Sequence, residues 1–107
     1  MTTFDEREQG FEAAFAHDQE VEFRAQMRRD RLLGLWAGER MGLSGAELEA
    51  YAAGLCRTEL REHDEERLAQ KVIADLAEKG VEALPHEVRD RMGSLLAAAR
   101  AEIKDGR

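Results

Sequence analysis

Hydrophobic and polar positions follow a helical period along most of the chain. Apolar side chains recur every three or four positions in residues 48–60 and 68–76. The cleanest stripe lies near the C-terminus and contains Val88, Met92, Leu95, Leu96, Ala99 and Ile103. Such spacing places apolar side chains on one face of an α-helix, whereas a strand needs a period of two, which the sequence does not sustain. The pattern therefore predicts an all-α fold.

Helix-capping signals divide this pattern into four helices. The predicted starts are Thr3 and Ser44, each opening a capping box, Asp64 as an N-cap, and Pro85 at the first helical position. Gly42 and Gly80 stand where a helix commonly ends, because glycine adopts a left-handed conformation without strain. The connections are short, so consecutive helices are expected to be antiparallel neighbours. The predicted architecture is a small four-helix bundle.

The first helix-prone run, residues 4–36, carries two separate apolar faces. At 100° per residue, Phe4, Phe11 and Phe15 lie within about 40° of one another. Toward the C-terminus the same stripe continues through three polar residues and then two apolar ones: Asp18, Glu22, Arg29, Leu33 and Trp36. The later apolar face is expected to belong to the core, whereas the earlier one has too little apolar surface beside it to form a core of its own.

The beginning of this run is expected to behave differently from the rest. Gly10 costs the early helix about 1 kcal/mol relative to alanine. A helix of this length is only marginally stable in water without tertiary packing. We therefore expect residues 1–17 to form a protruding, partly disordered N-terminal arm, and residues 18–107 to form the bundle.

The three phenylalanines of this arm have two interpretations. They either fold back and cover the bundle, or they anchor the arm in a groove of a partner protein, as the apolar face of an amphipathic helix does. Aromatic side chains bury a large area and are frequent binding hot spots. Arg7 is a candidate partner for a carboxylate. His17, at the boundary with the bundle, is a candidate for making the interaction depend on pH.

The charge of the chain limits its partners. The 107 residues carry a formal net charge of −7, and the single cysteine, Cys56, rules out an internal disulfide. An acidic chain lacks the basic surface with which proteins bind nucleic acids and anionic membranes. No apolar run approaches the ~20 residues of a transmembrane helix, and the acidic N-terminus is unlike a signal peptide. These features predict a cytoplasmic protein that binds no nucleic acid and does not insert into a membrane.

Residues suited to catalysis or metal binding form no recognisable arrangement. The three histidines are far apart in the sequence, and neither a glycine-rich phosphate loop nor a catalytic triad stands out. Arg28, Arg29 and Arg31 form a local basic patch, which is either a solvated helix face or an anchor for carboxylates or phosphates. Trp36 is expected in the core, with a contact on the bundle surface as the alternative. We expect neither enzymatic activity nor a bound metal.

Two segments together resemble the ζ subunit family, whose members are small inhibitors of the alphaproteobacterial F-type ATP synthase. The segments are TFDEREQGFEAAFAHDQE at the N-terminus and RDRLLGLWAGERMG over residues 29–42. The resemblance continues through residues 71–76 and 79–81 and through His86, Arg89 and Met92. It therefore covers essentially the whole chain.

The resemblance implies a four-helix bundle that anchors an inhibitory arm. In the family, the arm inserts into F1 at an α/β interface close to the γ shaft and blocks rotation in the hydrolytic direction. The matching positions here are Phe4, Arg7, Phe11 and Phe15. The implied partners are the F1 α, β and γ subunits, and the implied location is peripheral to the inner membrane through ATP synthase. We expect the free protein to be a monomer.

A second function is also compatible with the resemblance. Purine nucleotide binding has been proposed for the bundle of this family, although the sequence assigns no residues to such a site. The alternative function is therefore a helical regulatory module that senses a purine nucleotide without strong inhibition. No other cofactor is expected.

Overall fold

The computed structural model describes the backbone of residues 3–104 and the side chains of residues 17–104. Four helices follow one another along the chain: α1 (Thr3–Arg40), α2 (Gly45–Glu62), α3 (Glu65–Glu78) and α4 (Pro85–Lys104). No strand occurs within residues 3–104. The prediction of an all-α fold with four helices is confirmed.

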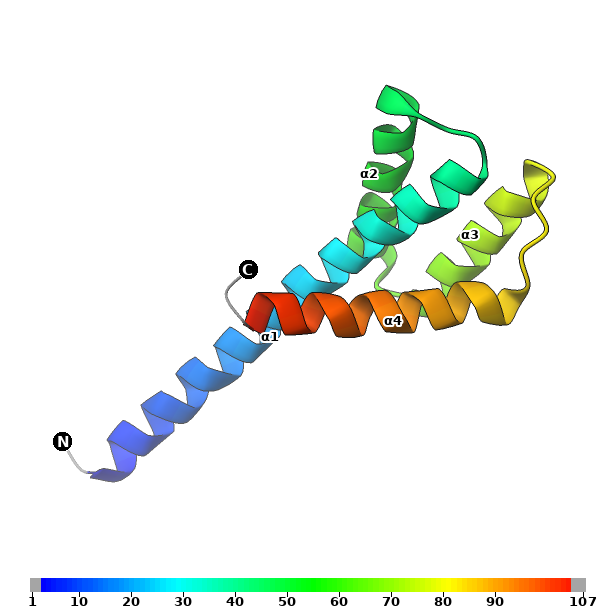
Figure 1. The fold of residues 1–107 in the computed structure, drawn as a ribbon. Coiled ribbons are helices and arrows are strands. Elements are labelled where there is room, and N and C mark those ends of the chain that lie inside the picture. The colour runs from blue at the N-terminus through cyan, green and yellow to red at the C-terminus, as the bar shows by residue number, and fades with distance from the viewer. Residues whose placement is uncertain (1–2, 105–107) are drawn as a thin grey trace.

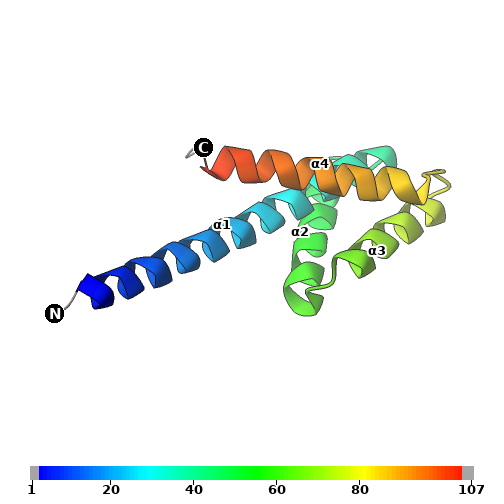
Figure 2. The same ribbon diagram turned by 90° about the horizontal axis from the view of Figure 1, so that it is seen from below.

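Helix α1 is the element on which the others are assembled. Its C-terminal half packs against α2 on one side and α4 on another, while α3 closes the domain mainly against α4 (Figure 1). The view in Figure 2 shows the N-terminal half of α1 extending beyond the other three helices. The dimensions of the molecule, 64 × 25 × 22 Å, reflect this extension. The backbone of α1 runs through residue 17 without a break.

Two predicted glycine stops are confirmed by their geometry. Gly42 and Gly80 both have positive φ, at 85° and 74°. In each case the following N–H reaches back to the last turn of the helix. The Leu43 N–H donates to the Gly38 carbonyl at 2.9 Å, and the Val81 N–H donates to a carbonyl of α3 at the same distance. These bonds satisfy carbonyl groups that the helix end would otherwise leave open, so both glycines end their helices as Schellman caps.

The predicted helix starts are confirmed in two cases and incomplete in a third. The Asp64 carboxylate accepts a hydrogen bond from the Arg67 N–H at 3.1 Å, and Pro85 is the first residue of α4. Ser44 is the N-cap of α2, but its side chain makes no capping hydrogen bond. The reciprocal capping box expected there is therefore wrong. The Thr3 side chain lies outside the described residues.

The core lies where all four helices meet. Its buried members are Leu33, Ala37, Leu55, Leu68, Ala69, Val72, Leu76, Val88 and Met92. Trp36 is half-buried at the edge of this core, and the guanidinium groups of Arg40 and Arg91 lie 5.2 and 5.1 Å from its ring centre. Its predicted core position is thus only partly correct. Leu60, expected on the buried stripe of α2, is 47% exposed.

Candidate functional site

Four of the predicted site residues lie on the N-terminal half of α1. Phe4, Arg7, Phe11 and Phe15 belong to its helical backbone, but their side chains lie outside the described residues. Their contacts therefore stay predictions. His17, the fifth, is the first residue whose side chain is described, and it is exposed.

Immediately after residue 17, α4 fastens the middle of α1 to the domain. Val21 and Ala25 become buried there. The Arg100 Nε donates to the Glu22 carboxylate at 2.8 Å, which holds the pKa of Glu22 below its usual range. One turn and a half further along, Arg28 pairs with Glu102 at 2.9 Å. Two buried apolar side chains and two ion pairs thus mark where α1 enters the bundle.

A buried ionic cluster holds α1 to α2 and α3 a short way beyond this point. Arg29 and Asp30 are 1% and 0% exposed, and Glu59 of α2 is 4% exposed. The Arg29 Nε donates to Asp30 at 2.9 Å, and its Nη1 donates to Glu65 at the start of α3 at 3.0 Å. The Arg29 Nη2 lies 3.6 Å from Glu59. One guanidinium therefore joins three helices.

This cluster changes the interpretation of the arginines at residues 28–31. Of the two interpretations, the solvated face is wrong at Arg29, which is buried and binds carboxylates of the protein itself. Arg31 does lie on the surface, where it pairs with Glu49 at 2.9 Å. A signal for the burial of Arg29 was present in the sequence, because Ala25 and Leu33 lie four residues before and after it on the same helix face.

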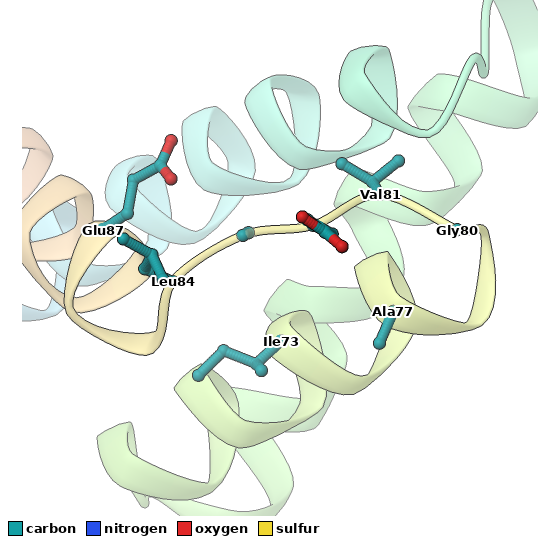
Figure 3. Close-up of a pocket in the computed structure, with 8 residues that line it drawn as sticks. Ile73, Ala77, Gly80, Val81, Leu84 and Glu87 are labelled. Atoms are coloured by element: carbon teal, nitrogen blue, oxygen red, sulfur yellow. The ribbon is translucent and has the colours of Figure 1, made fainter.

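Two hollows of the described surface offer little to a nucleotide. A hollow of about 870 Å³ lies beside the connection between α3 and α4 (Figure 3). Ile73 of α3 and Val81 and Leu84 of the connection give it an apolar lining, and Glu82 and Glu87 are its charged residues. Carboxylates at these positions would repel the phosphates of a nucleotide.

A second hollow, of about 250 Å³, lies next to the buried cluster. Its two arginines are already engaged, since Arg29 binds Glu65 and Arg89 binds Glu66. Neither of these two hollows supports a purine nucleotide site, and that alternative stays a prediction. Within residues 17–104, moreover, no three His, Cys, Asp or Glu side chains are grouped so that they could hold a metal ion.

Comparison with known proteins decides the family. A family model described as ATPase inhibitor subunit zeta matches residues 1–102. The chain belongs to the ATPase inhibitor subunit zeta family. Its role is therefore that of an F1-ATPase inhibitor, which is a regulator and not an enzyme. The family predicted from the two sequence segments is confirmed, and so is binding to F1-ATPase as a general role.

A solved structure supports the fold of this zeta chain. A protein described by solution NMR is 37% identical to it, with a TM-score of 0.68. The similarity covers 81% of this chain and 99% of the other. A comparison with curated proteins found no match. Among the described residues of the zeta chain, none of the helices combines the length and apolar character needed to cross a membrane.

Proposed function

We propose that the zeta chain inhibits ATP hydrolysis by inserting residues 1–17 into F1 as a helix. The insertion site is an α/β interface near the γ shaft, where the helix blocks rotation. Residues 18–107 anchor this segment and hold it on the enzyme. The observation that carries the proposal is the continuity of α1, whose N-terminal half extends beyond the bundle while its C-terminal half forms part of the core (Figure 2).

The N-terminal half of α1 has the chemistry of a docking helix. Helical spacing puts Phe4, Phe11 and Phe15 within about 40° of one another. We infer that these rings fill an apolar groove and that Arg7 meets a carboxylate of F1. Gly10 lowers the intrinsic helix propensity of this segment, so we expect contacts with F1 to add to the stability of its helix.

The C-terminal half of α1 has the chemistry of an anchor. Leu33 and Ala37 are fully buried in the core, and the Arg29 cluster ties the helix to α2 and α3. The pair formed by Glu22 and Arg100 adds α4. Because arm and anchor share one helix axis, the bundle sets the direction in which the arm leaves it. A steric block needs such a fixed base, since a freely pivoting arm would follow the rotor.

Deleting residues 1–15 separates the two halves of this proposal. The shortened chain should lose inhibition of F1-ATPase, because the docking helix is gone. Its circular dichroism and urea unfolding should still show a folded helical domain, because the buried core residues within 17–104 all lie after residue 20. Inhibition by the shortened chain that equals inhibition by the full chain would disprove the role of the arm.

A matched pair of phenylalanine variants tests the groove itself. Changing Phe11 and Phe15 together to alanine should raise the concentration needed for half-inhibition at least about tenfold, mainly by faster dissociation. Phe23→Ala is the control, since Phe23 lies on the same helix, is 48% exposed, and follows the proposed arm. Equal loss of inhibition in both variants would show that aromatic surface in general, and not the N-terminal face, matters.

A further inference from the structure

The junction of α1, α2 and α3 buries more negative than positive charge. Arg29 supplies the one guanidinium, while Asp30, Glu59 and Glu65 supply three carboxylates. Glu65 is half-exposed and therefore solvated, but Asp30 and Glu59 are almost completely buried. If all three carboxylates were ionised, the cluster would carry a net charge of −2, much of it away from water. Buried charge without a partner is strongly unfavourable.

The hydrogen bonds of the cluster leave more acceptors than donors without a partner. The Asp30 Oδ2, the Glu59 Oε2 and the Arg29 Nη2 are buried and have no hydrogen-bond partner among the described residues. Each of these carboxylates contacts Arg29 through its other oxygen only. A proton on one of the unpartnered oxygens would remove a buried negative charge and create a hydroxyl donor.

We propose that Asp30 and Glu59 together bind one proton in the folded protein near neutral pH, and that acidification stabilises the fold through this buried site. The two carboxylates titrate as a coupled pair, so the proton belongs to the site and not to one residue. Nothing in the proposed inhibition of F1 requires this proton.

The charges facing the site come from all four helices and one connection. Facing the two carboxylates directly are Arg29 on α1, His63 between α2 and α3, and Asp64 and Glu65 at the start of α3. Cys56 on α2 faces Asp30 and is itself faced by Arg31 and Arg57, and Arg100 of α4 faces Glu65. Among the side chains that the structure describes, only Arg29 lies within ion-pair distance of the two buried carboxylates. Burial raises the pKa of Asp30 to about 7 in spite of the opposing effect of Arg29. Burial also raises the pKa of Glu59, again against Arg29.

The direction of the pH effect follows from proton linkage. An unfolded Asp or Glu releases its proton near pH 4, whereas the folded site keeps a proton up to about pH 7. In that window the folded state binds more protons than the unfolded state, so stability is greatest at the acid end and is lost as pH rises through the folded pKa. For a folded pKa of about 7, the folding equilibrium constant should rise about tenfold between pH 8 and pH 6.

The position of the site gives this linkage a consequence for the inhibitor. Deprotonation leaves uncompensated charge at the base of α1, where that helix enters the bundle. Acidification should therefore strengthen the attachment of the helix that carries the arm, a consequence that rests on the proposed function. Unfolding of the free full-length chain measures the proton site without F1, so its outcome is independent of the inhibition measured after arm deletion.

Urea unfolding of the full-length chain at pH 6, 7 and 8 measures the linkage. The wild type should show the tenfold rise toward pH 6. Asp30→Asn and Glu59→Gln each remove one member of the pair, and the loss of that rise in at least one of them is expected. Glu49→Gln is the control, since Glu49 is an exposed acid paired with Arg31, and it should keep the rise. Carboxyl carbon NMR should show titration of Asp30 near pH 7 in the wild type, and titration of Glu59 above the usual range of a glutamate.

Three results would overturn the proposal. The first is a wild-type folding constant that stays constant or falls toward pH 6. The second is a tenfold rise that persists in both Asp30→Asn and Glu59→Gln. The third is carboxyl NMR in which neither residue titrates above pH 6.

Discussion

Replacing Gly34 with alanine should separate α1 from α2. A Cβ at Gly34 would lie 2.5 Å from the Ala52 Cα and 3.0 Å from the Ala52 Cβ. The nearest atom belongs to the backbone, so no side-chain rotation relieves the contact and the two helices must move apart. Overpacking of this kind costs about 1–3 kcal/mol, and a backbone contact this short places Gly34 near the upper end. Alanine also has a higher helix propensity than glycine, which offsets about 1 kcal/mol of this cost. We expect a net destabilisation of about 2 kcal/mol.

Gly93→Ala is the matched control for this change. Gly93 lies inside α4, and a Cβ there would meet no atom within 4 Å. Only the propensity gain applies, so Gly93→Ala should stabilise the protein by about 0.5–1 kcal/mol. Urea unfolding of both variants and the wild type at one pH gives the two differences directly. The two variants should therefore differ by about 3 kcal/mol, although both make the same chemical change in a helix.

The reasoning about close packing would be refuted by a Gly34→Ala protein as stable as the wild type or more stable. That result would mean that α1 and α2 separate at no cost. If Gly93→Ala were destabilising as well, the assumed gain in helix propensity from glycine to alanine would be wrong for this protein. In that case the comparison of the two glycines would lose its physical basis.

Three further stability predictions come from individual contacts. Asp64→Ala should cost about 1 kcal/mol by removing the α3 cap, whereas Ser44→Ala should cost much less because Ser44 makes no cap bond; urea unfolding of both measures the difference. Tyr51→Phe should cost about 1 kcal/mol in the same assay, because the Tyr51 hydroxyl donates to Asp75 at 2.8 Å. Burial and Asp75 raise the pKa of Tyr51, so an absorbance titration should form tyrosinate at higher pH in the folded chain than in urea. Leu55→Ala should cost about 2–5 kcal/mol, since Leu55 is fully buried, and a smaller loss by thermal unfolding would contradict its place in the core.

The family was predictable from the sequence, whereas the contacts of the predicted arm residues stay a prediction. The phenylalanine spacing at the N-terminus and the motif of residues 29–42 were sufficient to indicate the family and to predict an N-terminal arm. The Arg29 cluster was not predicted, because an arginine with other arginines beside it in the sequence is most often exposed to solvent. Its helical register with Ala25 and Leu33 placed it on a buried face, yet the register alone does not say which acids will meet it.

The sequence by itself determined the helices and most of their ends. The stops at Gly42 and Gly80 and the starts at Asp64 and Pro85 depend on groups within one helical turn, so neighbouring residues carry the whole signal. Only the tertiary structure decided which polar groups are buried. Asp30 and Glu59 are 29 residues apart in the sequence, and each is buried only because α1, α2 and α3 come together. Burial depends on partners that are distant along the chain, which is why local pattern could predict the four helices but not the charged cluster between them.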